Sequence, residues 1–183
     1  HNDLFHLYPT DGYVNGIRSN YPFGETNNPS KTTGNGSKLG SSSFSGYSGT
    51  VFEPIDEYKG DFARTYFYMA TRYNSEGKNT FSHGNGTVVF KSSYPFLTSY
   101  ATNLFVKWHL EDPVSDKEIN RNDAVYDIQK NRNPYIDHPE YVNDIWGGEY
   151  EAPTPTPTTY NVTYSVGSGV SFSYTDNTKY TSG

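Results

Sequence analysis

Two stretches in the middle of the chain carry apolar residues at helical spacing. The first stripe consists of Phe62, Tyr66, Met69 and Tyr73. Its spacing of i, i+4, i+7 and i+11 predicts a helix over residues 60–74 with the stripe on a core face. A second helix is predicted in LTSYATNLFVKWHLED, and its apolar face consists of Leu97, Ala101, Leu104, Phe105 and Trp108.

Capping signals predict two more helices further along the chain. Ser115 and Glu118 form a capping box, which opens a third helix after the DP break. The expected apolar face of this helix consists of Ile119, Ala124, Val125 and Ile128. The stretch HPEYVNDIW predicts a short fourth helix with Pro139 at its first position, where a missing N–H is tolerated.

Two segments between these helices carry weaker patterns. Residues 24–50 are rich in Gly, Ser, Asn and Thr and lack apolar periodicity. They are predicted to form a long surface loop with one short strand near Ser43–Tyr47. Residues 79–96 alternate loosely between apolar and polar positions, which predicts a short extended piece.

The C-terminal part of the chain differs from the rest. PTPTPT is typical of a stiff linker, and YNVTYSV and VSFSY around a Gly/Ser turn alternate like two strands of a hairpin. We expect a domain at 1–149, a linker at 150–159 and the start of a further β domain at 160–183. The predicted fold class is α+β: a mainly helical domain followed by a C-terminal β-hairpin appendage.

Composition and charge narrow the function classes. The 183 residues suit one globular domain with a short appendage, and the absence of cysteine excludes disulfides and thiolate metal sites. The net charge of −6 argues against a protein that binds nucleic acid through a broad basic surface. It argues much less against an enzyme that uses one local patch and a metal. No apolar stretch has the length of a membrane span. We expect the protein to be exported and monomeric.

Chemically capable side chains gather in the opening segment DLFHLYPTDGYVNGIRSN. LFHLYP predicts a short strand that carries His6, and Thr10 or Asp11 caps a tight turn or short helix after it. Asn15 follows inside that helix. Capping is the usual role of such a residue, but an amide oxygen at this place is also a suitable ligand for Mg²⁺. Arg18 comes next as a candidate fork for phosphate.

Two other clusters combine cations with polar residues. In KGDFAR, Lys59 and Arg64 bracket the start of a predicted helix. In NRNPYIDHP, Arg132 is flanked by two Asn and followed by Asp137 and His138. The three cations are candidate contacts to nucleic acid.

Three segments together resemble the bacterial endonuclease I family. They are DLFHLYPTDGYVNGIRSNYPFGE, FEPIDEYKGDFARTYFYMATRY and WHLEDPVSDKEINRNDAVYDIQKNRNPYIDHPEYVNDIW, in the family's order, over about residues 2–147. The resemblance implies a secreted or periplasmic nuclease built on a ββα-metal finger, also called a His-Me finger. It implies cleavage of DNA, and often of RNA, that depends on Mg²⁺, with Ca²⁺ and Mn²⁺ as alternatives.

The family's site residues match this sequence only in part. Asn15 in GYVNG matches the metal-ligand Asn, and Arg18 and Asn20 match the R-x-N that follows it. The family's general base, a His in an R-E-H or W-E-H motif, has no match, so we expect the chain to begin inside a partial finger. Phe5 stands where the family's D-L-H-H motif has its first His. His6 is then a candidate base, and packing or hydrogen bonding is its alternative role.

The other histidines have ordinary interpretations. His109 is expected at a surface or interface of its helix, His138 as a structural cap beside Asp137, and His83 in a loop. A zinc site is not expected, because the sequence has no cysteine, no His pair at i and i+4 and no clustered carboxylates.

Three functions compete on these grounds. The first is a Mg²⁺-dependent endonuclease whose general base lies upstream of this stretch. The second is a catalytically inactive nuclease-like domain that binds nucleic acid or a surface. The third is an exported carbohydrate-binding β protein, which the predicted helices argue against. Cleavage of supercoiled plasmid with Mg²⁺ but not with EDTA separates the first from the second, and a far-UV spectrum tests the third.

Overall fold

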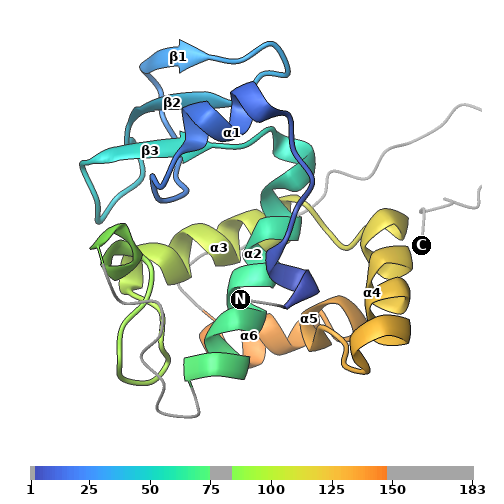
Figure 1. Ribbon diagram of the computed structural model, residues 1–183. Coiled ribbons are helices and arrows are strands. Elements are labelled where there is room, and N and C mark those ends of the chain that lie inside the picture. Colours follow the sequence, from blue (N-terminus) through green and yellow to red (C-terminus); the bar gives the residue numbers. More distant parts are fainter. Residues whose placement is uncertain (1–2, 75–83, 148–183) are drawn as a thin grey trace, which may run out of the picture. The chain divides into compact units, whose positions relative to one another are not determined.

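The computed structural model describes residues 3–74 and 84–147, and its fold class is α+β as predicted (Figure 1). The α-helices in these ranges are α1 (Gly12–Arg18), α2 (Lys59–Met69), α3 (Ser99–Glu111), α4 (Asp116–Gln129), α5 (Pro134–Asp137) and α6 (Glu140–Trp146). The strands are β1 (Pro29–Thr32), β2 (Lys38–Ser41) and β3 (Thr50–Glu53). Single turns are η1 (Leu4–His6), η2 (Asp56–Tyr58), η3 (Ala70–Asn74) and η4 (Gly84–Val88).

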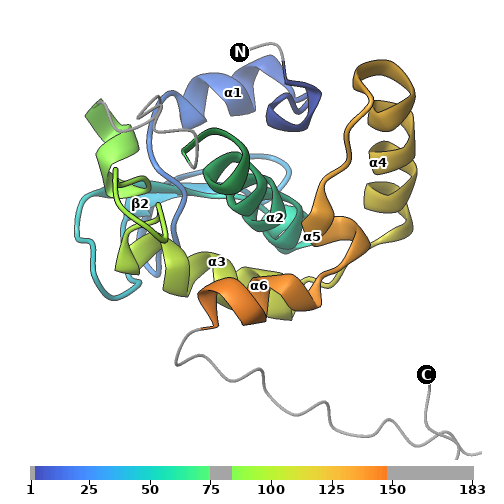
Figure 2. The same ribbon diagram turned by 90° about the horizontal axis from the view of Figure 1, so that it is seen from below.

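Helix α2 runs through the centre of the described domain, between α1 on one side and α3 with α6 on the other (Figure 2). The π-helical turn η3 extends it to Asn74, where the sequence predicts its end. Met69 of the predicted stripe is buried, and so is Phe67 on the neighbouring face. The rest of the stripe is only partly buried, namely Phe62, Tyr66 and Tyr73. A single apolar stripe does not describe the buried surface of this helix, because other elements cover the helix on nearly all sides.

Helix α3 confirms the second predicted stripe. Every member of that stripe is buried: Leu97, Ala101, Leu104, Phe105 and Trp108. Thr98 caps the helix, because its hydroxyl accepts a hydrogen bond of 3.2 Å from the Ala101 N–H. Just before it, Phe90 of the predicted extended piece forms an isolated antiparallel bridge with Leu97, the residue that follows that piece. Residues 79–83 of that piece lie outside the described residues.

The sheet corrects the prediction of a long loop over residues 24–50. Its strands are antiparallel in the order β1-β2-β3, and Leu39 lies opposite Phe52. Both side chains pack into the core. Strands of four residues that are rich in Gly, Ser and Lys show too little alternation to be recognised. The predicted strand at Ser43–Tyr47 is a turn instead, and Gly46 takes a φ of +99° there, which favours glycine.

Helix α4 begins at the predicted capping box but buries a different face. The Ser115 Oγ accepts from the Glu118 N–H at 3.3 Å, and a Glu118 oxygen accepts from the Ser115 N–H at 3.2 Å. The predicted apolar face is right only for Val125, which is buried, since Ile119 and Ile128 are 44% and 73% exposed. The buried side chains of this helix are Glu118, Asn122 and Val125. Two of them are polar, because they bond to buried groups of other elements.

Two short helices complete the described domain. Asn133 caps α5, which the sequence analysis did not predict, by accepting from the Tyr135 N–H at 3.0 Å, and Pro134 takes the first position. Helix α6 confirms the predicted short helix, although Pro139 is its N-cap rather than its first residue. Within the described residues, no helix has both the length and the apolarity needed to cross a membrane.

The predicted strand LFHLYP is wrong, because Leu4–His6 forms the 3-10 turn η1 and Phe5 is fully buried beneath it. The described opening segment is therefore a turn followed by α1. The predicted linker at 150–159 and the predicted β appendage at 160–183 lie outside the described residues.

Candidate active site

A pocket of about 190 Å³ lies where the opening segment, α1, β3 and α2 meet. Three residues singled out from the sequence, His6, Asn15 and Arg18, all line it. The remaining lining residues are Tyr8, Thr10, Val14, Phe23, Phe52, Phe62, Thr65 and Tyr66. Polar groups of the opening segment and α1 therefore face a set of aromatic rings.

Helix α1 presents Asn15 and Arg18 from one side. Asp11 caps the helix as predicted, with its carboxylate accepting from the N–H groups of Tyr13 at 2.9 Å and Val14 at 3.1 Å. The Asn15 side chain is exposed, and its backbone N–H donates to the Asp11 carbonyl at 2.9 Å. Regular helical bonding leaves the Asn15 amide group on the pocket side.

Arg18 combines a positive charge with an unsatisfied donor. Its Nη1 donates to the Ser19 carbonyl at 3.0 Å, and its guanidinium carbon lies 5.0 Å from the centre of the Phe23 ring. The Nε of Arg18 is buried and has no hydrogen-bond partner among the described residues. An anion in the pocket would satisfy this donor, since a buried unpaired N–H is costly.

His6 follows the buried Phe5 and is exposed on the pocket side of η1. Partial desolvation of the ring, and then the positive charge of Arg18, lower the pKa of His6 below its usual value. The imidazole is therefore predominantly neutral near pH 7. A neutral imidazole can accept a proton, which is the property a general base needs.

Tyr8 joins the opening segment to α2. Its hydroxyl shares a hydrogen bond of 2.7 Å with the Thr65 hydroxyl and donates to the Asp61 carbonyl at 3.2 Å. Burial raises the pKa of Tyr8 to about 12, although the charge of Arg121 acts in the opposite direction. The phenol therefore stays protonated and serves as a hydrogen-bonding group.

Aromatic rings close the floor of the pocket. Phe23 stacks on Phe62 with ring centres 4.7 Å apart and meets Tyr66 edge-on at 5.7 Å. Phe52 of β3 lies 6.3 Å from Phe23. Burial raises the pKa of Tyr66, and the charge of Arg18 opposes that change. The floor keeps water away from one side of the cationic and polar groups.

The other predicted contacts to nucleic acid lie away from the pocket. Asn20 is exposed outside the lining, and its carbonyl accepts from Asn85 Nδ2 at 3.1 Å. Lys59 is buried, with its Nζ 2.9 Å from a Glu53 oxygen and 2.7 Å from an Asp56 oxygen. Its charge is thus neutralised within the fold.

Arg64 is likewise an interior residue. Its side chain is 0% exposed, and its Nε and Nη2 donate to Glu118 oxygens at 2.7 and 2.6 Å. This geometry leaves no surface of Arg64 for a phosphate. Its Nη1 also lies 3.1 Å from His109 Nδ1. His109 is buried, so the prediction of a surface or interface position for it is wrong.

Arg132 and His138 lie together near α5. Arg132 pairs with Asp137 through two hydrogen bonds of 2.8 Å and with Asp123 at 2.7 Å, so its planar group is fully engaged. His138 has the predicted role of a cap, at the C-terminal end of α5, and its backbone N–H donates to the Pro134 carbonyl at 2.8 Å. Neither residue lines the pocket.

The oxygen donors of the pocket are neutral. The lining residues include the Asn15 amide and hydroxyls of Thr10, Thr65 and Tyr8, and none of them is a carboxylate. Within residues 3–74 and 84–147, no group of three His, Asp or Glu side chains converges on a metal position. The donor set therefore fits an oxygen-seeking ion that keeps most of its water, as Mg²⁺ does.

Several pocket residues have no signal in the sequence. Tyr8 and Thr65 are ordinary members of a strand-like and a helical pattern, and only the fold brings them together. Phe23 and Phe52 flank a segment that was predicted to be a loop. The only local sign that these two positions are buried is that each is an apolar residue at an end of this polar segment.

Comparisons with known proteins agree on one family. Residues 1–140 match the family model described as Endonuclease I. The chain is 38% identical over 152 residues to an extracellular ribonuclease of Bacillus amyloliquefaciens, covering 79% of this chain and 46% of that protein. It is 29% identical over 135 residues to an Endonuclease-1 of Buchnera aphidicola, covering 73% and 44%. It is 27% identical over 135 residues to a periplasmic deoxyribonuclease of Aeromonas hydrophila, covering 74% and 47%.

The chain has a small α+β domain in which the short helix α1 brings the amide of Asn15 and the guanidinium of Arg18 to a pocket with an aromatic floor. The chain spans about half the length of the curated relatives it matches. It belongs to the endonuclease I family.

Proposed function

We propose that the protein is an endonuclease that hydrolyses phosphodiester bonds of nucleic acid with the help of a divalent metal ion. Membership of the endonuclease I family supports this function. The observation that carries it is the pocket in which His6, Asn15 and Arg18 meet. Cleavage of a phosphodiester needs few protein groups, because positioning and charge neutralisation do most of the work.

Each of the three side chains has one task in this proposal. Arg18 binds the scissile phosphate, and its buried, unpartnered Nε is a donor that a phosphate oxygen would satisfy. His6 accepts a proton from the attacking water, since its lowered pKa keeps it neutral at physiological pH. Asn15 contributes its side-chain oxygen as a metal ligand.

The metal is proposed to be Mg²⁺, with Ca²⁺ or Mn²⁺ as alternatives. Asn15 would hold it, together with water molecules and an oxygen of the bound phosphate, because the described lining residues offer neutral oxygen donors only. When bound, such an ion stabilises negative charge on the phosphate and on the leaving oxygen.

We infer that the substrates include both DNA and RNA and that the protein is secreted or periplasmic. The relatives include proteins named extracellular ribonuclease, periplasmic deoxyribonuclease and extracellular deoxyribonuclease. A pocket that contacts the backbone through one Arg and a metal does not by itself distinguish the two sugars.

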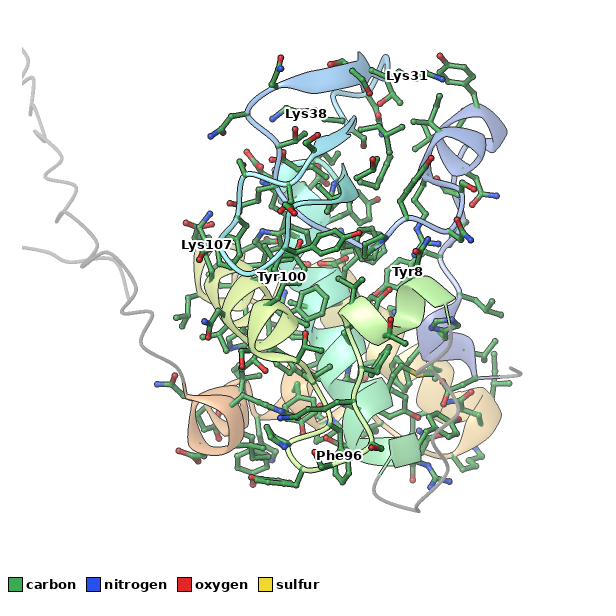
Figure 3. The ribbon with its side chains drawn as sticks, turned by 90° about the vertical axis from the view of Figure 1, so that its left-hand side faces the viewer. Tyr8, Lys31, Lys38, Phe96, Tyr100 and Lys107 are labelled. Atoms are coloured by element: carbon green, nitrogen blue, oxygen red, sulfur yellow. The ribbon has the colours of Figure 1, made fainter. Side chains whose placement is uncertain are left out.

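The test is cleavage of supercoiled plasmid and of single-stranded RNA with MgCl₂ and with EDTA. Nicking that EDTA abolishes is expected. Arg18→Ala should lower kcat/KM by on the order of 10²-fold, since it removes a donor that stabilises transition-state charge. Lys31→Gln is the matched control: Lys31 is exposed on β1, apart from Tyr8 and the pocket, and the variant should keep the wild-type rate (Figure 3).

Two outcomes would contradict the proposal. Cleavage that persists in EDTA would exclude the metal-dependent reaction. A gel shift of nucleic acid without any cleavage in MgCl₂ would favour a nuclease-like binding module instead.

A further inference from the structure

Residues 4–8 bring His6 and Tyr8 to the pocket but have little regular structure of their own. The segment contains the single turn η1, and no strand of the described residues pairs with it. Apart from the Leu4 carbonyl, which also accepts from the Leu7 N–H at 3.3 Å, its backbone carbonyls must find donors elsewhere, because buried or half-buried carbonyls are rarely left unpaired. Three of them find the same donor, the guanidinium of Arg121 on α4.

The contacts of Arg121 surround His6. Its Nη2 lies 2.8 Å from the Leu4 carbonyl oxygen, 3.2 Å from that of Phe5 and 3.0 Å from that of Leu7. His6 sits between the last two of these carbonyls in the chain. The backbone is thus held on both sides of the residue that points to the pocket.

Arg121 holds Tyr8 as well. Its Nη1 donates to the Tyr8 hydroxyl at 3.1 Å, and its guanidinium carbon lies 4.1 Å from the centre of the Tyr8 ring. The same hydroxyl bonds to Thr65 on α2, another pocket residue. One planar group therefore joins α4, the opening segment and α2.

We propose that Arg121 is a positioning residue for the candidate active site. It fixes the backbone on either side of His6 and the ring of Tyr8, and so determines where both side chains stand in the pocket. This inference rests on the proposed nuclease function. Only an arginine offers a flat fork with several N–H donors that can also stack on an aromatic ring, so a lysine cannot replace it.

The beginning of the opening segment is also attached to α4 independently of Arg121, through Gln129. Gln129, two turns further along α4, accepts from the Leu4 N–H at 3.0 Å and donates to an Asp3 oxygen at 3.2 Å. The other Asp3 oxygen accepts from the hydroxyls of Tyr68 and Tyr73, both at 2.7 Å. The beginning of the segment therefore keeps these contacts when Arg121 is replaced, whereas the carbonyls of Phe5 and Leu7 on either side of His6 lose their donor.

The experiment compares Arg121→Lys and Arg121→Ala with wild type on plasmid in MgCl₂. We expect kcat to fall by on the order of 10²-fold with little change in KM, because misplacement of a catalytic group by about 1 Å has that effect. Free guanidinium at low concentration should restore part of the activity of Arg121→Ala. The matched control is Val125→Ala, which removes a buried side chain one turn along the same helix and should keep the wild-type kcat.

Three results would overturn the inference. These are a wild-type kcat in Arg121→Lys, an equal loss of kcat in Val125→Ala, or no rescue of Arg121→Ala by guanidinium. If wild type itself does not cleave, the proposed function fails, and NMR in EDTA then decides the positioning role separately. The His6 ring signals should shift in Arg121→Lys and not in Val125→Ala; unchanged signals in Arg121→Lys would contradict it.

Discussion

Arg64 and Arg18 have the same side chain and opposite surroundings. Arg64 is fully buried and bonded through two nitrogens to Glu118, whereas Arg18 keeps a buried Nε without a partner among the described residues. Removing one member of a buried ion pair leaves an uncompensated charge, so Arg64 maintains the fold. Arg18 has a donor available for a ligand. At the scale of single residues, the partner of a cation decides its role.

His109 gives this buried cluster a dependence on pH. Burial, and then the charge of Arg64, lower the pKa of His109 from 6.5 to about 4. Between these values the unfolded chain binds a proton that the folded protein does not, so stability is lost as the pH falls. Asp61 opposes this trend, because burial and then Glu118 raise its pKa to about 6, and the folded protein takes up a proton there.

His109→Gln should remove the destabilising part of this dependence. Between neutral pH and about pH 4.5, the free energy of unfolding of wild type should fall by on the order of 2 kcal/mol more than that of the variant. Urea unfolding at both pH values measures it. His138→Gln, at an exposed histidine, should follow wild type. Parallel pH profiles for wild type and His109→Gln would contradict this account.

Helix α4 shows how an element can be held by polar contacts. Asn122 is 0% exposed, and its Oδ1 accepts from the Asn133 N–H at 2.9 Å while its Nδ2 donates to Asp137 at 3.0 Å. Glu118 on the same face holds Arg64. The apolar Ile119 and Ile128 face solvent instead. The helix is therefore attached largely by hydrogen bonds, through a different face from the apolar one that was expected.

Replacement of one polar and one apolar residue of α4 tests this reversal. Asn122→Ala should lower the free energy of unfolding by about 2 kcal/mol, because the buried Asn133 N–H is left unpaired. Ile128→Ala should change it by no more than about 0.5 kcal/mol, as exposed substitutions usually do. Urea unfolding of both variants decides. A larger cost for Ile128→Ala than for Asn122→Ala would restore the apolar face predicted from the sequence.

An element could be predicted from the sequence where its signal lies within a few neighbouring residues. The capping box of Ser115 and the stripe around Trp108 are local, and both predicted their helices correctly. The buried face of α4 could not be predicted, because its partners lie on α2 and α5 and are polar. The sheet was missed because its four-residue strands carry no readable alternation.

The same reasoning applies to the candidate active site. Asn15 and Arg18 were found because they lie three residues apart in one motif, and the fold brings His6 to the same pocket. Tyr8 and Arg121 were not found, because they are 113 residues apart and neither has a motif of its own.

At the scale of the whole molecule, more than half of the cations of the described domain are held by partners within the fold. The protein has a net charge of −6. Many of its described cations pair with carboxylates: Lys38, Lys59, Arg64, Lys107, Lys117 and Arg132. Arg121 is occupied by backbone carbonyls. Binding of nucleic acid should then depend on one local site rather than on a broad basic surface.

This distribution of charge predicts a weak dependence of binding on salt. Each phosphate contact contributes roughly −0.9 to the slope of log K against log salt concentration, so we expect a slope between about −1 and −2. Fluorescence anisotropy of a labelled duplex in EDTA, over a series of NaCl concentrations, measures it. A slope steeper than about −4 would mean that an extended basic surface takes part.

The link from Arg121 to Leu4 also has a consequence for the order in which the protein is made. These residues are 117 positions apart, and a ribosome delivers the opening segment long before α4. Contacts between such distant residues form late in folding, because the chain must lose entropy to close the long loop between them before the contact can stabilise the fold. A nascent chain therefore carries its pocket residues without the group that sets them in place. The wall around His6 is completed only when the far end of the domain has been synthesised and folded.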